Sequence, residues 1–277
     1  MGSYKQVVKE LSVKLRGVTH IPVKEVEILL QYLLDKNTIW LHMNYDKPCE
    51  CEKELALLVD KRATNYPLEY ITKKATFYGE IFQVQEGVLI PRPETELLVE
   101  KVEKHFKNQS NIKILEIGVG SGIISVMLAK LLPNSSFIAV DINTQAIDLA
   151  KQNAHYHGVE NKITFIHSDL FDTISHEIEF DCVVSNPPYI ANDYKLPSNV
   201  KFEPSNALFG GDVGDELLKS IIIETYNRKI PYLVCEMGYD QKKPLKDFIE
   251  QNTQVKSLQF YSDYEKFDRG FEVEFKV

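Results

Sequence analysis

The stretch Asn186-Pro187-Pro188-Tyr189 combines residue types that could hold a planar amino group. It directly follows an apolar run, residues 180–185, which is typical of a buried strand. The asparagine side chain offers a carbonyl oxygen as acceptor, and two consecutive prolines, each with φ fixed at about −65°, stiffen the loop. Tyr189 adds a flat ring against which a planar group can pack. Taken alone, the stretch could equally be a proline-rich turn, so its interpretation depends on what precedes it.

A glycine-rich turn lies upstream, at Gly118-Val119-Gly120-Ser121-Gly122. It separates an apolar run, residues 112–117, from an amphipathic segment, residues 123–131, as in the first strand, turn and helix of a parallel α/β sheet. Glycines let the backbone approach a ligand closely, and the first turn of the next helix can bind an anion. The third glycine comes one residue too early for the dinucleotide pattern G-x-G-x-x-G, which argues against nicotinamide binding.

Polar residues also follow the next two predicted strands. Asp141 comes after the apolar run 136–140, and its carboxylate could accept hydrogen bonds from both hydroxyl groups of a ribose. Asp169 and Leu170 follow the run 163–166 and place a polar side chain beside an apolar one, which suits the edge and the face of an adenine. Because ligands of open α/β sheets bind at the carboxyl ends of the strands, we expect these residues to meet the glycine turn and Asn186.

This order of motifs resembles that of S-adenosylmethionine-dependent methyltransferases, and most closely the HemK-type peptide chain release factor N5-glutamine methyltransferases (PrmC family). The resemblance extends from roughly residue 60 to the C-terminus, and the segments that carry it are 67–71, 77–79, 88–96, 118–122, 186–190, 203–211, 236–241 and 268–269. It implies an α/β fold: a doubly wound, Rossmann-like methyltransferase domain with a small N-terminal helical bundle.

The resemblance also implies a reaction. A methyl group would pass from S-adenosylmethionine to the side-chain amide nitrogen (N5) of the glutamine in the Gly-Gly-Gln motif of class 1 release factors, which would be the protein partners. The implied catalytic residues are Asn186, Pro187, Pro188 and Tyr189. The implied cofactor-binding residues are Gly118, Val119, Gly120, Ser121, Gly122, Asp141, Asp169, Leu170, Asn186 and Thr95, the last of these near the methionine moiety. No metal is expected.

The residues themselves indicate only a site for a planar amino group, so several alternatives stay open. Adenine, guanine and cytosine carry similar exocyclic amino groups, so an N6-adenine or other nucleic-acid methyltransferase is one alternative. A ribosomal-protein glutamine methyltransferase and a cofactor-binding scaffold without activity are others. The formal net charge is −8, because residues 1–73 carry +1 and the residues after 73 carry −9. A region this acidic is poorly suited to neutralising phosphates, so we expect no direct nucleic-acid substrate.

The chain of 277 residues, 44% of them hydrophobic, can bury one large core and a smaller one. Apolar residues at helical spacing predict helices over residues 1–70, and the resemblance makes this part the substrate-recognition domain. A β-hairpin linker over 71–90, with its turn at Gly79-Glu80, and a methyltransferase domain over 91–277 are expected to follow. No run of about 18 apolar residues and no signal peptide occur, so we expect a cytoplasmic monomer without membrane contact.

Overall fold

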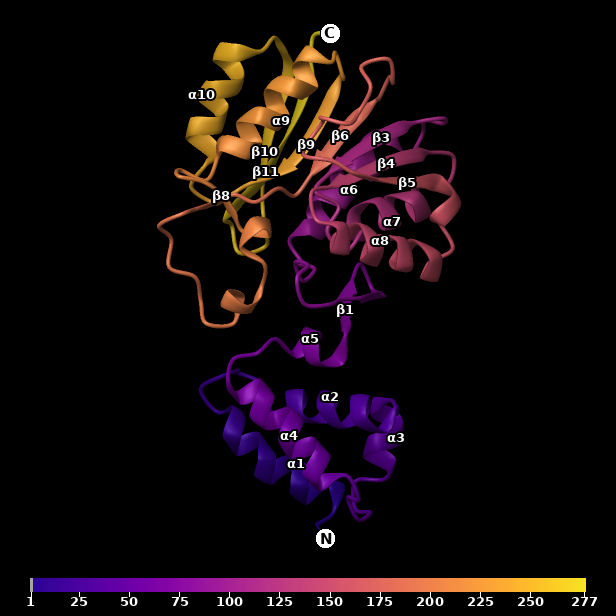
Figure 1. Ribbon diagram of the computed structural model, residues 1–277, viewed down its shortest axis with the longest axis vertical. Helices are drawn as coiled ribbons and strands as arrows, with labels where there is room; N and C mark the ends of the chain where they lie inside the picture. Colours follow the sequence, from indigo (N-terminus) through magenta and orange to yellow (C-terminus); the bar gives the residue numbers. More distant parts are fainter. Residues whose placement is uncertain (1) are drawn as a thin grey trace. The chain divides into compact units, whose positions relative to one another are not determined.

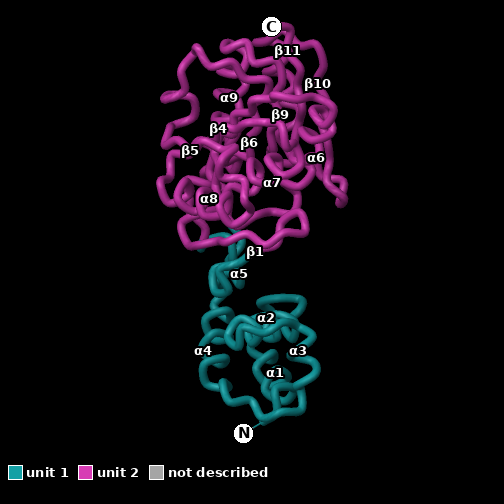
Figure 2. Tube along the Cα trace, turned by 90° about the vertical axis from the view of Figure 1, so that its right-hand side faces the viewer, with its two compact units in different colours: residues 1–74, 196–202 teal, residues 75–195, 203–277 magenta. Residues whose placement is uncertain are grey.

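The computed structural model describes residues 2–277, which form two compact units (Figure 2). The helical unit comprises the residues up to Lys74 together with Leu196–Phe202, and the sheet unit comprises Ala75–Lys195 and Glu203–Val277. No local pattern indicates that residues 196–202 belong with the N-terminal helices. The domain boundaries after residues 70 and 90 stay a prediction.

The helical unit contains helices α1 Tyr4–Ser12, α2 Pro22–Leu34, α3 Thr38–Met43, α4 Glu52–Ala63 and α5 Leu68–Thr72. The apolar residues at helical spacing predicted helices in this part of the chain, and α1, α2 and α4 confirm the prediction. Ser3 caps α1, because its hydroxyl accepts a hydrogen bond from the Gln6 N–H while the Gln6 side chain accepts one from the Ser3 N–H. The sequence did not predict α3 and α5, which are too short to show a helical repeat of apolar residues.

A buried ion pair joins α4 to α2. The Arg62 Nε donates to one carboxylate oxygen of Glu25 at 2.6 Å, and its Nη2 donates to the other at 3.2 Å. Only 8% of Arg62 and 7% of Glu25 is exposed to solvent. Two parallel hydrogen bonds of this kind fix the relative position of two helices as well as pairing the charges.

The sheet unit is built on a seven-stranded sheet with strand order β10-β11-β9-β6-β3-β4-β5 (Figure 1). Its strands are β3 Lys113–Ile117, β4 Ser136–Asp141, β5 Ile163–His167, β6 Cys182–Ser185, β9 Tyr232–Glu236, β10 Val255–Ser262 and β11 Asp268–Phe275. The first five strands in this list run parallel, which confirms the doubly wound arrangement. The strands β10 and β11 form an antiparallel edge that the sequence did not predict.

Helices cover both faces of this sheet. They are α6 Thr95–Phe106, α7 Ile123–Leu131, α8 Thr144–Tyr156, α9 Glu216–Asn227 and α10 Lys242–Asn252. Neighbouring residues of a strand point to opposite faces, so Ile114 packs in the core with α6, α7 and α8, while Leu115 packs in the core with α9 and α10. Both layers are thus anchored on the same central strand, β3.

Two small two-stranded sheets complete the fold: β1 Lys74–Phe77 with β2 Glu80–Gln83, and β7 Ile190–Ala191 with β8 Phe209–Gly211. The first is the predicted hairpin, with its turn one residue earlier than predicted. Tyr78 and Gly79 both have positive φ, 55° and 76°, as a two-residue hairpin turn requires. In residues 2–277, no helix is both long and apolar enough to cross a lipid bilayer.

The ion pair of the helical unit leads to a stability prediction. Arg62→Met leaves the buried carboxylate of Glu25 unpaired and should lower the free energy of unfolding by about 3–5 kcal/mol. Lys14→Met is the matched control, because Lys14 pairs with Asp60 at the surface, with side chains 45% and 55% exposed. Lys14→Met should lower the free energy of unfolding by less than about 1 kcal/mol. Urea denaturation followed by fluorescence of Trp40, the single tryptophan and part of α3, reports on this unit. Equal losses in the two variants would contradict the prediction.

Candidate active site

The ends of four parallel strands meet at one edge of the sheet. Ile117 of β3 pairs with Val140 of β4 and with Ser185 of β6, so the residues that follow, Gly118, Asp141 and Asn186, emerge close together. A cavity of about 370 Å³ lies there, a volume suited to a small-molecule ligand. The predicted site residues that line it are Gly118, Gly120, Asp141, Asp169, Leu170, Asn186, Pro187 and Pro188.

A smaller hollow of about 30 Å³ is lined by the other side of the glycine turn and by the first turn of α6. Thr95, Val119 and Ser121 contribute to it, together with Asn186. Of the predicted site residues, only Gly122 and Tyr189 line neither space. The structure therefore brings nearly all of them to one place.

Backbone geometry shapes the glycine turn. The N–H groups of Gly118 and Val119 both donate to the Val140 carbonyl at 2.9 Å, which ties the turn to the end of β4. Gly122 has φ of +83°, and a Cβ there would lie 3.0 Å from the Cβ of Ala150 on α8. A larger residue at this position would strain the backbone and push α8 away from the turn.

Both carboxylate oxygens of Asp141 are held by backbone groups. One accepts a hydrogen bond from the Gly120 N–H at 2.9 Å, and the other accepts one from the Asn143 N–H at 2.8 Å. Burial raises the pKa of Asp141, and these two N–H groups oppose the increase. Each carboxylate oxygen has a second lone pair, so the side chain can still accept hydrogen bonds from a ligand.

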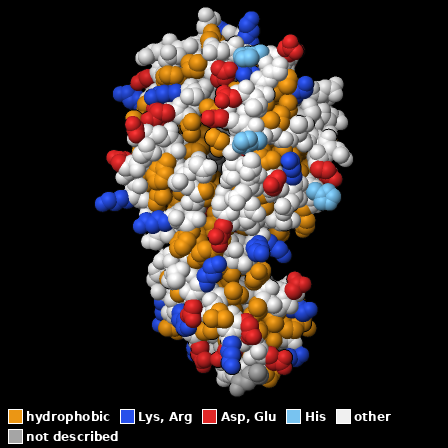
Figure 3. All heavy atoms as spheres, viewed as in Figure 1, with side chains coloured by type: hydrophobic (Ala, Val, Ile, Leu, Met, Phe, Trp, Pro, Cys, Tyr) orange, Lys and Arg blue, Asp and Glu red, His pale blue; other side chains and the backbone are white. Residues whose placement is uncertain are grey.

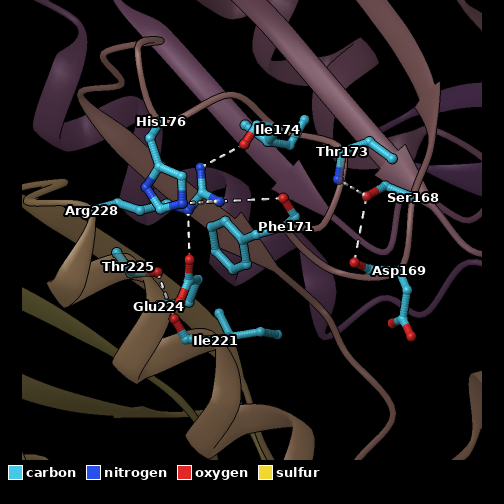
Figure 4. A network of polar contacts seen from close by, with 10 residues as sticks. All are labelled: Ser168, Asp169, Phe171, Thr173, Ile174, His176, Ile221, Glu224, Thr225 and Arg228. Atoms are coloured by element: carbon cyan, nitrogen blue, oxygen red, sulfur yellow. Dashed lines mark hydrogen bonds and ion pairs between the residues drawn. The ribbon is translucent and has the colours of Figure 1, made fainter.

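Arg228, at the end of α9, holds the loop after β5 in place (Figure 4). Its guanidinium donates to the carbonyl of Ile174 at 2.9 Å and to that of Phe171 at 3.3 Å, and its carbon lies 5.2 Å from the centre of the Phe171 ring. Leu170 has a positive φ of 42° in this loop. The Asp169 carboxylate points away from the network, and both Asp169 and Leu170 line the cavity.

The loop that carries Asn186 is braced by the segment that returns from residues 203 to 214. The Ile190 N–H donates to the Leu208 carbonyl at 3.0 Å, and Gly210 packs so closely that a Cβ would lie 2.4 Å from the Pro188 carbonyl oxygen. Glu203, only 7% exposed, accepts hydrogen bonds from the Ile90 N–H and from Arg92. Arg92 is therefore an ion-pair partner that holds the segment before α6.

Buried polar groups lie behind Asn186. Its Nδ2 donates to the Thr95 hydroxyl at 3.0 Å, and that hydroxyl donates to Glu236 Oε2 at 2.7 Å. The Tyr189 hydroxyl donates to Glu236 Oε1 at 3.1 Å. Burial raises the pKa of Glu236 to about 7, and the hydroxyl groups of Thr95 and Tyr189 oppose the increase. Burial and the nearby carboxylate raise the pKa of Tyr189, so its hydroxyl remains a donor.

Sequence reasoning missed three residues that support the site: Asn143, Glu203 and Glu236. Asn143 could have been found, because an asparagine directly before a helix is a common N-cap, and here its side chain accepts from the Gln145 N–H. Glu236 ends an apolar strand in the same way as Asp141, although nothing local to it identifies its partners. Glu203 belongs to a segment that carries the family resemblance, but its partners lie more than a hundred residues earlier in the chain and could not be identified from it.

Comparisons with known proteins agree with this architecture. The model of the PrmC N-terminal domain matches residues 6–72, and that of the Methyltransferase small domain matches residues 93–200. The release factor glutamine methyltransferase of Fusobacterium nucleatum subsp. nucleatum is 37% identical over 266 residues, which cover 92% of this chain and 74% of that protein. Its counterpart in Rhodopirellula baltica is 34% identical over 259 residues, covering 90% of this chain and 88% of that protein.

A solved structure also shares the fold. The N-terminal domain of human METTL16 in complex with SAH aligns with a TM-score of 0.52 and 19% identity over 71% of this chain and 76% of that chain. At this identity the likeness concerns the fold alone. The sequence matches go further, because they extend over both units of the chain, and they confirm the resemblance seen in the motifs. The chain belongs to the family of release factor glutamine methyltransferases.

Proposed function

We propose that Asn186 and Pro187 hold the side-chain amide of the glutamine in the Gly-Gly-Gln motif of class 1 release factors while its N5 nitrogen is methylated. The protein is an S-adenosylmethionine-dependent glutamine methyltransferase by family. The observation that supports our assignment of roles is that Asn186 and Pro187 line the same cavity as the glycine turn and Asp141. Acceptor and cofactor-binding residues thus share one space.

The chemistry requires precise orientation. An amide nitrogen is a poor nucleophile because its lone pair is delocalised into the carbonyl group. The Asn186 side-chain oxygen and the Pro187 backbone carbonyl can accept hydrogen bonds from the two N–H groups and so aim the nitrogen. The same acceptors stabilise the positive charge that develops on nitrogen. S-adenosylmethionine, when bound, supplies the methyl group. We also propose that Tyr189 packs on the amide plane.

We propose the following arrangement of the cofactor in the cavity. We assign the ribose hydroxyls to Asp141, the adenine to Asp169 and Leu170, and the remaining contacts to the backbone of residues 118–122. We further assign Thr95 and Asn186 to the methionine end of the cofactor, where the smaller hollow lies. Thr95 contributes contacts other than its hydroxyl, which is already paired with Asn186 and Glu236. The free lone pairs of the Asp141 carboxylate and the fixed conformation of the Leu170 loop support these assignments.

A nucleic-acid amino group remains the alternative acceptor. On the face shown in Figure 3, the Lys and Arg side chains of the described residues are interspersed with Asp and Glu side chains and form no continuous basic band. With a net charge of −8, this favours a protein acceptor over a polyanion. A ribosomal protein is the other alternative substrate, and the side-chain amide of its glutamine would donate hydrogen bonds to the same two acceptors.

We assign recognition of the release factor to residues 1–70, since the short Gly-Gly-Gln loop offers little contact area by itself. We also propose that the enzyme is a monomer and that it acts in the cytoplasm, where translation is terminated. Light scattering and cell fractionation test these two points, and a stable dimer or an exported protein would contradict them.

Asp141→Ala should weaken the binding of S-adenosylmethionine at least ~10-fold, because two ribose hydroxyls lose a charged acceptor at a cost of about 1.5–3 kcal/mol. Calorimetric titration measures this affinity. Asp172→Ala, an exposed position in the loop after β5, is the matched control and should bind normally. An unchanged affinity in the Asp141 variant would exclude the ribose assignment, provided that the melting temperatures show both variants to be folded.

Asn186→Ala should lower kcat for release factor methylation by ~10²-fold or more, as expected when one preorganised electrostatic partner is lost. Cofactor affinity should change much less than in the Asp141 variant. Asn192→Ala, at an exposed asparagine of the same loop, serves as control. Steady-state assays with labelled cofactor at saturating release factor give kcat, and a kcat within a few-fold of wild type would rule out the amide-orienting role.

Deletion of residues 1–70 should separate recognition from chemistry. The truncated protein should still bind S-adenosylmethionine, while methylation of the intact release factor should fall sharply. Phe202 loses its ring contact with Tyr66, 5.3 Å between centroids, so folding is checked first by circular dichroism. A folded truncation that methylates the release factor at full efficiency would contradict the assignment.

A further inference from the structure

A chain of hydrogen bonds behind Asn186 ends at a buried carboxylate. Asn186 Nδ2 donates to Thr95 Oγ1 at 3.0 Å, and Thr95 Oγ1 donates to Glu236 Oε2 at 2.7 Å. Thr95 is fully buried and Glu236 is 2% exposed. Buried polar groups are normally paired, so this chain is a stable part of the structure and is shielded from water.

The sheet register brings these residues together from distant parts of the sequence. Ser185 of β6 pairs with Cys235 of β9, so the residues that follow them, Asn186 and Glu236, emerge at neighbouring strand ends. Thr95 begins α6 and reaches both side chains. The same carboxylate accepts a hydrogen bond from the Tyr189 hydroxyl at 3.1 Å and so also holds the far end of the Asn186–Tyr189 loop.

The donors and acceptors in this chain permit one orientation of the Asn186 amide. When Glu236 is ionised, the Thr95 hydroxyl gives its single hydrogen to that carboxylate, so toward Asn186 it can only accept. Nδ2 must therefore face Thr95, and the carbonyl oxygen Oδ1 must point the other way. Asn186 lines the cavity. Within residues 2–277, no group donates a hydrogen bond to its Oδ1 atom. The reversed amide would place two oxygens in contact with no hydrogen between them.

We propose that Thr95 and Glu236 are positioning residues that lock the Asn186 amide with its carbonyl oxygen toward the substrate. The proposal rests on the proposed function, in which that oxygen accepts a hydrogen bond from the glutamine amide. A freely turning asparagine would present its NH2 group for part of the time and repel the substrate NH2. The locked asparagine presents an acceptor only, and it selects an amide over a carboxylate, which has no hydrogen to donate.

Thr95→Val is the sharpest variant, because it keeps the shape of the side chain and removes the hydroxyl. At pH 8, where Glu236 is ionised, it should lower kcat at least ~10-fold while the dissociation constant for S-adenosylmethionine stays within ~3-fold. Thr95→Ser restores the hydroxyl and should recover most of the lost rate. Thr225→Val is the matched control, since Thr225 is also fully buried and its hydroxyl donates only to the Ile221 carbonyl, within α9.

Two further measurements separate positioning from a general structural defect. In an Asn186→Ala background, Thr95→Val should lower kcat no further, because Thr95 affects kcat only by orienting the Asn186 side chain, which is then absent. In the substrate-free protein, the side-chain NH2 signals of Asn186 in a ¹⁵N NMR spectrum should shift in Thr95→Val and return in Thr95→Ser. The NMR result does not depend on which acceptor is methylated.

The outcomes are distinguishable. If the wild type transfers no methyl group to a release factor, the proposed function fails, and the NMR signals still decide whether Thr95 orients Asn186. If the wild type is active and Thr95→Val keeps kcat within ~2-fold with unchanged NH2 signals, the positioning role is wrong. A loss of cofactor affinity as large as the loss in kcat would also overturn it, because Thr95 would then act on the cofactor.

Discussion

The parallel pairing of β3 with β4 on one side and with β6 on the other is the constraint on which the site depends. Ile117 is opposite Val140 and Ser185, and this register places Gly118, Asp141 and Asn186 at one level of the sheet edge. A shift of one residue in either pairing would turn the buried side chains of a strand to the wrong face. The alternation of Ile114 and Leu115 between the two cores therefore fixes the register, and with it the geometry of the site.

Buried acids then hold the loops that extend beyond the sheet. Glu203 connects the return segment to residues 90–92, and Glu236 connects the start of α6 to the loop of Asn186 and Tyr189. Glu236 accepts hydrogen bonds from two different segments, whereas both hydrogen bonds to Glu203 come from residues 90–92. The loss of either carboxylate would therefore disconnect two segments. Such fully satisfied buried networks rigidify a structure more than isolated surface contacts do. Rigidity suits a reaction that depends on aiming an amide nitrogen.

The sequence predicted those elements of the fold that show a local pattern of residue types. Apolar runs followed by glycine, aspartate or asparagine predicted the strands β3, β4, β5 and β6. The antiparallel edge of β10 and β11 was not predicted. In β11 the buried Phe271, Val273 and Phe275 alternate with glutamates as is typical of a strand, but in β10 the apolar residues do not alternate regularly. The roles of Thr95 and Glu236 were also beyond local patterns, since the two side chains meet across 141 positions of the chain.

The most direct test of the account follows the methyl group to its acceptor. Wild-type protein is incubated with labelled S-adenosylmethionine and either a class 1 release factor, the same factor with the Gly-Gly-Gln glutamine replaced by glutamate, or duplex DNA. Mass spectrometry of the peptides then locates the label. The account predicts one methyl group on that glutamine and none on the glutamate factor or on DNA. Labelling of DNA, or equal labelling of the two factors, would contradict it.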